Sequence, residues 1–392
     1  MKKWLIRAMM VLLGLVAVPF LLFPAGAALP HVKILGPVGT FAILYIGPWL
    51  LLITAALAAI AWWRWKFARS MAVLLLALLL SAAATGDLVL VGTILAAARA
   101  SGLHVDLAQT LFLTRDKIQT APEADAVYAT LRGEPMGMAI IPASGAGQGP
   151  TPVLVYVHGG GWTSGDYRGR LDELRWFAAH GMTAVAMQYP LSSATRHLWD
   201  STQADIGCGL AWVGTNIARY GGDPSRIALL GESAGGNLVL NAGYMANAAQ
   251  LGSSCGGAVP RVAAVVAIYP ATDAVDLYHN RDTLKSVGIE ALNAYVGGPP
   301  EQFPDRYRTI TSFTYIHPGA PATLLLLPDD DAIVPPQRTR EFAAQARSAG
   351  VSVRLVEAPF ANHGFDLVPG SIGNQIMRQA TIGFLKAQGL IR

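Results

Sequence analysis

The segment Arg226-Ile227-Ala228-Leu229-Leu230-Gly231-Glu232-Ser233-Ala234-Gly235 decides the fold of this chain. Its apolar run ends at Leu230, a Gly-x-Ser-x-Gly turn follows, and helical spacing of apolar residues begins at Ala234. A strand, a tight turn and a helix in this order raise a serine hydroxyl above the strand end. The turn needs glycines because side chains flanking the serine would collide with neighbouring backbone. The segment therefore predicts an exposed, reactive serine, with the helix N-terminus directed at developing negative charge.

The composition indicates that part of the chain lies in a membrane. Of 392 residues, 53% are hydrophobic and 14% are charged, and the mean hydropathy is +0.40. This is more apolar than an ordinary soluble domain. The net charge of +4, without a basic run or a nucleic-acid motif, argues against a nucleic-acid partner. The two cysteines exclude a cysteine-rich scaffold, and the metal-site and phosphate-loop spacings are missing from the sequence, so no metal or cofactor is expected.

Three apolar runs in residues 1–99 predict two or three transmembrane helices, at about 9–24, 41–63 and 71–95. The second and third runs supply the roughly 20 apolar residues that a bilayer core requires. The first run follows three basic residues and precedes Ala25-Gly26-Ala27, so it is either a retained helix or a cleavable signal peptide. We expect the lipid bilayer to be a partner of this region.

The orientation follows from the basic residues between these runs. Arg64, Lys66 and Arg69 separate the second and third runs, whereas only Lys33 lies between the first and second. By the positive-inside rule the basic segments are cytoplasmic. The sequence therefore predicts a multi-pass protein of the cell membrane, with everything after about Arg99 on the extracytoplasmic side.

Residues 100–392 alternate apolar strands with amphipathic helices, separated by Gly and Pro. We expect strands at 136–142, 152–157, 183–188, 226–230, 262–269, 323–327 and 351–358, and helices at 171–180, 200–220, 336–349 and 372–388 besides the one after the serine. This alternation predicts an α/β domain with a mainly parallel sheet and helices on both faces. No strand is evident in 271–318, an aromatic-rich insertion that we expect to form a cap.

The chemistry requires a base for the serine and an acid to hold the base. In this fold class the acid and then the histidine follow the serine, each after a strand end. Asp331 follows the predicted strand 323–327, and His363 follows the strand 351–358. Asp329 and Asp330 adjoin Asp331 and remain alternatives for the acid. Asp331 is favoured because it leads through a short turn into the next helix.

A second motif predicts an oxyanion hole. Gly159-Gly160-Gly161 follows the predicted strand 152–157 and is flanked by His158 and Trp162. Glycines after a strand leave backbone N–H groups open to a tetrahedral intermediate, which needs about two or three donors. The candidates are Gly160, Gly161 and Ala234, and His158 is expected to orient the loop.

These motifs together resemble the α/β-hydrolase fold esterases. The resemblance is carried by His158-Gly159-Gly160-Gly161-Trp162, Tyr220-Gly221-Gly222-Asp223-Pro224-Ser225-Arg226-Ile227, Gly231-Glu232-Ser233-Ala234-Gly235-Gly236-Asn237-Leu238 and Asn362-His363-Gly364-Phe365. It is nearest to the hormone-sensitive-lipase-like carboxylesterases, with isoprenylcysteine methylesterase-like relatives, and covers about 136–388. It implies a triad of Ser233, Asp331 and His363 and a hole formed by Gly160, Gly161 and Ala234. Pro328 departs from the family, which has Gly three residues before the acid.

Two classes of function are compatible with these features. The first is a membrane-anchored serine hydrolase that cleaves carboxylic esters of small to medium size through an acyl-enzyme intermediate, without a cofactor. Thioesterases, lipases and peptidases share this machinery. The second is a non-catalytic binding protein of the hydrolase fold, which the complete set of triad and hole residues disfavours.

The two cysteines are candidates for a disulfide. Cys208 lies in the helix before the nucleophile strand, and Cys255 lies in the loop after the nucleophile helix. Those helices are neighbours in a sheet of this type, so the Cα atoms can approach within the roughly 4.4–6.8 Å that a bridge needs. An extracytoplasmic domain would favour oxidation. Two buried free cysteines are the alternative.

Overall fold

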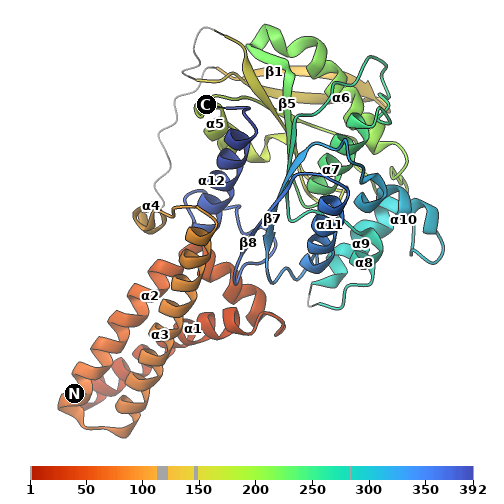
Figure 1. The fold of residues 1–392 in the computed structure, drawn as a ribbon. Helices are drawn as coiled ribbons and strands as arrows, with labels where there is room; N and C mark the ends of the chain where they lie inside the picture. The colour runs from red at the N-terminus through yellow and green to blue at the C-terminus, as the bar shows by residue number, and fades with distance from the viewer. Residues whose placement is uncertain (1, 113–121, 145–148, 283, 392) are drawn as a thin grey trace. The chain divides into compact units, whose positions relative to one another are not determined.

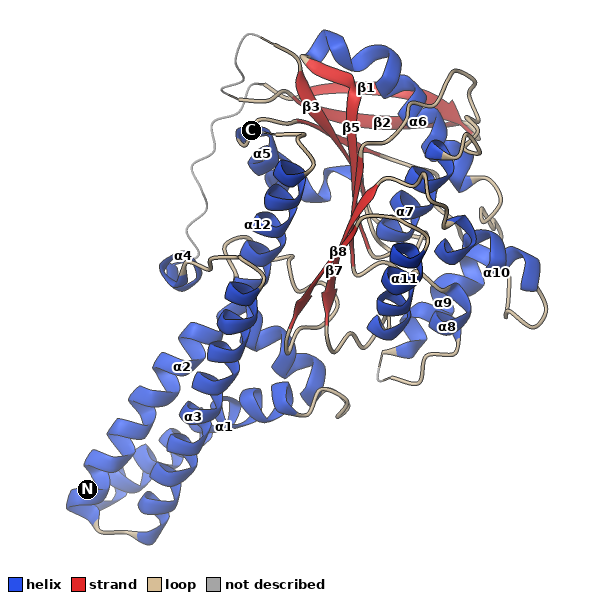
Figure 2. Ribbon diagram, in the orientation of Figure 1, coloured by secondary structure: helices blue, strands red, loops and turns tan. Residues whose placement is uncertain are grey.

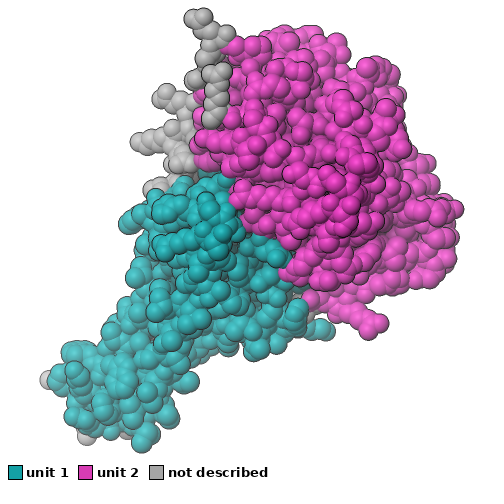
Figure 3. Space-filling view, in the orientation of Figure 1, with its two compact units in different colours: residues 1–115, 328–332, 357–379 teal, residues 116–327, 333–356, 380–392 magenta. Residues whose placement is uncertain are grey.

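The computed structural model of the chain describes residues 2–112, 122–144, 149–282 and 284–391, and the side chains of residues 2–13 are not described. The basic residues Lys2, Lys3 and Arg7 and the start of the first apolar run therefore lie outside the described side chains. The chain forms two compact units (Figure 3). The first unit comprises 1–115, 328–332 and 357–379, and the second comprises 116–327, 333–356 and 380–392. The predicted acid and histidine thus belong to the same unit as the N-terminal helices, and Ser233 belongs to the other.

The N-terminal helices of the first unit are α1 (Lys2–Ala28), α2 (Leu35–Ala68), α3 (Met71–Ala100) and the short α4 (Leu107–Phe112) (Figure 1). Helices α1, α2 and α3 pack against one another. By length and composition, two of the described helices, α2 and α3, are able to cross a membrane. Helix α2 is interrupted at Ile46, where φ is −130°, two residues before Pro48. Proline explains the interruption, because its ring crowds the preceding turn and removes a backbone donor.

The sheet confirms the predicted α/β architecture (Figure 2). In the described residues its eight strands lie in the order β1-β2-β4-β3-β5-β6-β7-β8. The bounds are Ala124–Leu131 (β1), Glu134–Ile141 (β2), Thr151–Val157 (β3), Thr183–Met187 (β4), Gly222–Glu232 (β5), Ala264–Ile268 (β6), Ala322–Pro328 (β7) and Val353–Ala358 (β8). Strands β4, β3, β5, β6 and β7 pair in parallel, whereas β1–β2 and β2–β4 are antiparallel.

Burial explains which strands the sequence reveals. All residues of β3, β4 and β6 are buried, as expected for central strands covered on both faces. Strand β1 was not predicted. It lies at the sheet edge, buries only Tyr128 and Leu131, and contains three alanines and Asp125, so its apolar signal is weak.

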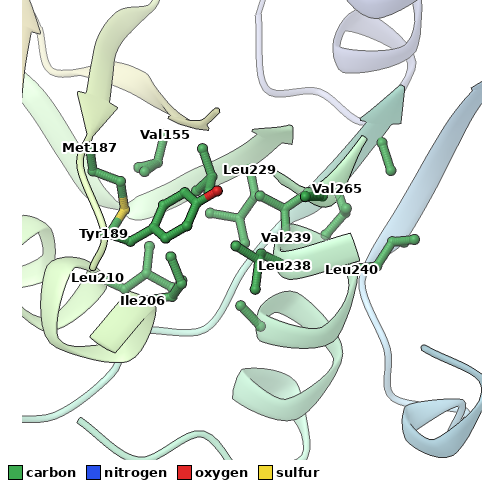
Figure 4. Packing of buried hydrophobic residues seen from close by; sticks show 14 of the residues in the cluster. Val155, Met187, Tyr189, Ile206, Leu210, Leu229, Leu238, Val239, Leu240 and Val265 are labelled. Carbon is green, nitrogen blue, oxygen red and sulfur yellow. The ribbon is translucent and has the colours of Figure 1, made fainter. Parts of the chain in front are cut away.

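The helices around the sheet are α5 (Leu171–Ala179), α6 (Thr202–Asn216), α7 (Ala234–Asn247), α11 (Pro336–Ser348) and α12 (Ile372–Ala387), with short 3₁₀ helices η1 (Tyr167–Arg170) and η2 (Ile217–Tyr220). Helix α5 packs on β4, and α7 packs on β5 and β6. Figure 4 shows part of the hydrophobic core between the sheet and the helices, where the ring of Tyr189 lies between Val155 and Leu210. Such burial of apolar area is the main stabilising contribution to the fold.

Cys208 in α6 and Cys255 in the loop after α7 form a disulfide with a Cα–Cα distance of 5.3 Å. The bridge ties the loop that follows the nucleophile helix to the helix that precedes the nucleophile strand. Of the two arrangements that the sequence leaves open, the structure contains the bridge.

The insertion 271–318 folds into α8 (Ala274–Tyr278), α9 (Lys285–Val296), α10 (Pro304–Ile310) and the 3₁₀ helix η3 (Ser312–Tyr315). Its described residues contain no strand, as predicted. Tyr295 and Tyr307 are 1% and 0% exposed, so these two aromatic side chains build the core of the insertion. The ring of Tyr295 stacks on Trp162 with 4.8 Å between ring centroids, which fixes the insertion to the glycine loop.

Candidate active site

Strand β5 and helix α7 present the predicted nucleophile at a strained turn. Ser233 has φ 55° and ψ −121°, a conformation that costs a non-glycine residue of order 1–3 kcal/mol. A Cβ atom on Gly231 would lie 2.3 Å from the carbonyl oxygen of Gly235, and one on Gly235 would lie 2.2 Å from that of Val157. Real Cβ atoms do not approach backbone so closely. The Gly-x-Ser-x-Gly pattern is therefore required by backbone packing at this turn.

The residue before the serine is fixed by polar partners that the sequence analysis missed. The hydroxyl of Tyr156 on β3 donates to Glu232 Oε1 at 2.9 Å. Arg170 Nε lies 3.7 Å from Glu232 Oε2, and both side chains are only 12–13% exposed. Because Glu232 and Ser233 are adjacent, these contacts restrain the strained turn from one side.

The glycine loop after β3, where the sequence predicts an oxyanion hole, turns sharply at Gly160 and Gly161. Gly160 and Gly161 have φ of 108° and 59°, in the region that favours glycine. The carbonyl of Gly160 accepts hydrogen bonds from the backbone N–H groups of Thr163 and Ser164 at 3.1 and 3.0 Å, which closes the turn. In the ranges that the structure describes, no backbone acceptor is paired with the N–H of Gly160 or Gly161.

Two further contacts place this loop beside the serine. A Cβ atom on Gly159 would lie 3.3 Å from Ser233 Cβ, so the loop and the serine turn are in van der Waals contact. Ala234 is the first residue of α7, and its N–H therefore has no acceptor within the helix. The three predicted donors thus come from two elements that meet at Ser233.

His158 is a buried residue of the loop framework. Its Nδ1 lies 2.7 Å from the carbonyl oxygen of Gly159, and its ring stacks on Tyr189 at 4.4 Å. Burial lowers the pKa of His158 below its ordinary value, which favours the neutral ring. These contacts agree with the expectation that His158 orients the glycine loop.

The first unit brings the predicted acid and base together. Asp331 Oδ2 lies 2.7 Å from His363 Nδ1, and the Asp331 side chain is fully buried whereas that of His363 is 14% exposed. A buried carboxylate at Nδ1 fixes the imidazole tautomer and leaves Nε2 to act as a proton acceptor.

Asp329 and Asp330 have different surroundings from Asp331. The backbone N–H of Asp329 donates to the Ala358 carbonyl at 3.1 Å, and that of Asp330 donates to the Ala361 carbonyl at 3.2 Å. These bonds set the register between the acid loop and the histidine loop. Burial, and then the neighbouring charge of Asp330, raise the pKa of Asp329 to about 7. The carboxylate of Asp331 is the one that lies within hydrogen-bond distance of His363 Nδ1.

Asn362 is a further site residue that the sequence analysis did not assign. Its Oδ1 accepts hydrogen bonds from the backbone N–H groups of Ala332 and His363, at 3.0 and 2.8 Å. One side chain thus ties the residue after the acid to the histidine itself. The only sequence signal was the position of Asn362 next to the histidine.

In the described residues, no group of three or more His, Cys, Asp or Glu side chains is placed to hold a metal ion.

Comparison with known proteins gives the family. The sequence profile of the BD-FAE family matches residues 140–346, which is more than half of the chain. This protein belongs to the BD-FAE family. The matched region of this BD-FAE protein contains the glycine loop, the serine turn, the insertion and Asp331, whereas His363 lies after it.

The similar proteins are esterases. The BD-FAE protein is 34% identical over 223 residues to LipM of Mycobacterium tuberculosis (strain ATCC 25618 / H37Rv), named a probable carboxylic ester hydrolase, covering 56% of this chain and 51% of LipM. It is 31% identical over 245 residues to the esterase LipQ of the same strain, covering 60% of this chain and 55% of LipQ. The chain therefore spans about half the length of these curated relatives.

Solved structures show the same fold. The thermophilic esterase Est2 of Thermogutta terrifontis, with propionate bound, has a TM-score of 0.56 and 21% identity, covering 70% of this chain and 97% of that chain. The α/β-hydrolase fold and the resemblance to serine esterases of that fold are therefore confirmed.

Proposed function

We propose that this BD-FAE protein is a membrane-anchored carboxylesterase that cleaves esters of small to medium size through an acyl-enzyme. Ser233 is the nucleophile, His363 the general base and Asp331 the acid that orients it. The observation that carries the proposal is the strained backbone of Ser233, with φ 55°, directly beside the glycine loop. Such strain persists only where the surrounding structure enforces it, and it is typical of reacting residues.

The proposed reaction proceeds in two halves. Ser233 Oγ attacks the ester carbonyl while His363 Nε2 takes its proton, and the N–H groups of Gly160, Gly161 and Ala234 donate to the oxyanion. The tetrahedral intermediate collapses, the C–O bond to the alcohol breaks, and His363 returns the proton to the leaving alkoxide. Water then attacks the acyl-enzyme with His363 as base, and the acid product leaves Ser233 regenerated.

Asp331 acts throughout by holding the histidine. Its buried carboxylate, 2.7 Å from Nδ1, stabilises the imidazolium that forms in each half-reaction.

The membrane part of the proposal has α2 and α3 crossing the bilayer and the catalytic part outside the cytoplasm. The lengths and apolar composition of these helices support the anchoring. The basic residues Arg64, Lys66 and Arg69 at their connection support the orientation. The disulfide between Cys208 and Cys255 also supports it, because such bonds persist in oxidising compartments.

The preference for small to medium acyl groups is supported by the insertion. A Cβ atom on Gly161 would lie 2.8 Å from Ala291 Cβ of α9, so the insertion lies against the glycine loop itself. The solved structure of Est2 has propionate bound, a carboxylate of matching size.

The test is hydrolysis of aryl esters of increasing acyl length by the purified full-length chain and two variants. Ser233→Ala should lower kcat by about six orders of magnitude, the loss that removal of a serine nucleophile can cause. Ser348→Ala is the matched control, since Ser348 is exposed and its hydroxyl donates to the Ala344 carbonyl of its own helix at 3.0 Å. Hydrolysis by Ser233→Ala at the wild-type rate would refute the proposal.

A further inference from the structure

We propose that helix α2 positions the catalytic histidine, with Thr40 and Tyr45 holding the residues on either side of His363. The N-terminal helices then contribute to turnover as well as to anchoring. The inference rests on the proposed role of His363 as the general base. All residues involved belong to the first compact unit (Figure 3).

Asn362 is the first link between α2 and the base. Its Oδ1 faces two backbone N–H groups, those of Ala332 and His363, so this atom must be the amide oxygen. The amide nitrogen therefore points the other way, where it donates to Thr40 Oγ1 at 3.2 Å. Asn362 is 1% exposed and Thr40 is 0% exposed, so water does not replace this bond readily.

Thr40 is arranged to accept that bond. Its hydroxyl lies 3.1 Å from the Gly36 carbonyl and 3.0 Å from the Pro37 carbonyl of the preceding turn, which take its single proton. A hydroxyl has one proton and two lone pairs, so the oxygen remains an acceptor for Asn362. Valine has the same shape as threonine but would leave the buried Asn362 nitrogen without this partner.

Tyr45 supplies a second link on the other side of the histidine. Its hydroxyl donates to the carbonyl oxygen of Gly364. Thr40 and Tyr45 lie on one helix five residues apart, and they bond the residues that precede and follow His363. The two contacts together restrain the backbone of the histidine from both sides, while Asp331 restrains its ring.

The segment of α2 that carries these residues is itself fixed. A Cβ atom on Gly39 would lie 2.3 Å from the Ala27 backbone nitrogen, and one on Gly26 would lie 2.2 Å from the Leu35 carbonyl oxygen. The ends of α1 and α2 therefore meet backbone to backbone, and this contact holds the first turns of α2.

Residues 35–45 of α2 are available to position His363, because the helix is longer than a bilayer core requires. Helix α2 has 34 residues, and at 1.5 Å per residue its length is about 51 Å, against a bilayer core of about 30 Å. The interruption at Ile46 separates residues 35–45 from the rest of the helix. We therefore assign the bilayer-spanning part of α2 to the residues after this interruption, and the positioning of His363 to the residues before it.

Three variants of the full-length protein test the proposal. Thr40→Val removes the acceptor for Asn362, Tyr45→Phe removes the donor to Gly364, and Thr40→Ser keeps the hydroxyl. We expect Thr40→Val and Tyr45→Phe each to lower kcat about tenfold, the factor associated with one buried hydrogen bond left unmade. KM should change less than about twofold, because the base acts in the transition state. Thr40→Ser should restore kcat to within about twofold of the wild type.

Matched controls separate this role from general damage to the fold. Thr54→Val changes another fully buried threonine of α2, whose hydroxyl donates to the Leu50 carbonyl at 2.7 Å. Tyr128→Phe removes another tyrosine hydroxyl that donates to a backbone carbonyl, that of Gln188, at 2.7 Å. Both should keep wild-type kcat. Rates are expressed per site titrated with a fluorophosphonate, so a lower yield of folded protein does not count as lower kcat.

A double-mutant cycle tests the route through Asn362. If Thr40 acts only by holding Asn362, then Thr40→Val should change kcat by less than about twofold in an Asn362→Ala background. Independent, multiplying effects of the two substitutions would overturn this route.

The results also distinguish this inference from the proposed function. An unmodified chain that hydrolyses no ester, or that is labelled elsewhere than Ser233, would refute the proposed function. An active chain labelled at Ser233, whose Thr40→Val and Tyr45→Phe variants keep wild-type kcat, would refute the positioning role alone.

Discussion

Replacing Asp331 by asparagine should separate the acid from its two neighbours. The Asp331 carboxylate is fully buried and lies 2.7 Å from His363 Nδ1. An asparagine there can present its NH₂ group to Nδ1, which would leave the proton on the other ring nitrogen and remove the base. The same substitution in a related catalytic arrangement lowers kcat by about 10⁴, because the tautomer is wrong. At about 1.36 kcal/mol per factor of ten, this corresponds to about 5.5 kcal/mol of transition-state stabilisation.

The assay is hydrolysis of a dissolved aryl butyrate, with kcat expressed per fluorophosphonate-titrated site. Asp330→Asn is the control, since it makes the same chemical change one residue away, and its kcat should stay within about threefold of the wild type. The reasoning would be refuted by Asp331→Asn with kcat within tenfold of the wild type. A larger loss in Asp330→Asn than in Asp331→Asn would move the acid by one position.

Three further predictions concern substrate size, the cysteines and pH. Dissolved butyrate esters should be turned over faster than emulsified long-chain triglycerides, because the insertion lies against the glycine loop. The reverse order of turnover rates would contradict this prediction. Alkylation should increase the mass of the peptides that contain Cys208 and Cys255 only after reduction. Cys208→Ser should lower the free energy of unfolding by up to about 4 kcal/mol, because the disulfide joins residues 47 positions apart. Labelling without reductant would refute the bridge. Because burial raises the pKa of Asp329 to about 7, its contribution to stability is present below pH 4 and is lost as pH rises through 7. Asp329→Asn should therefore raise Tm more at pH 8 than at pH 5, and an equal change at both would contradict this.

The parts of the fold that the sequence predicts are those encoded in contiguous residues. The buried strand Thr151–Val157 is an uninterrupted apolar run, and the serine turn is marked by Gly231 and Gly235, whose missing side chains make room for backbone. Local patterns of this kind carry their own physical cause. The edge strand Ala124–Leu131 lacks such a pattern and was missed, since its stability comes from pairing with β2.

The geometry of the acid and base depends on contacts between distant residues. Among three consecutive aspartates, the one that faces His363 is set by backbone hydrogen bonds from Asp329 and Asp330 to the histidine loop. The bond from Asn362 to Thr40 joins residues that are 322 positions apart. No periodicity or motif encodes such a pairing, so residues 1–99 were interpreted only as a membrane region.

The orientation of the chain in the membrane remains a prediction. A C-terminal reporter that is active only in the cytoplasm should give no signal, because the connection with Arg64, Lys66 and Arg69 is expected on the cytoplasmic side. A bright cytoplasmic signal would reverse the orientation, and with it the expectation of an oxidising environment for the cysteines.

The most direct test of the central claim is the site of covalent modification by a fluorophosphonate, mapped by peptide mass spectrometry on the full-length protein. The strained turn at Ser233, the donors of Gly160, Gly161 and Ala234, and the pair of Asp331 and His363 predict a single modified residue, Ser233. Prior incubation with a butyrate ester should slow the labelling. Modification of any other serine, or no modification of a chain that hydrolyses esters, would contradict the account.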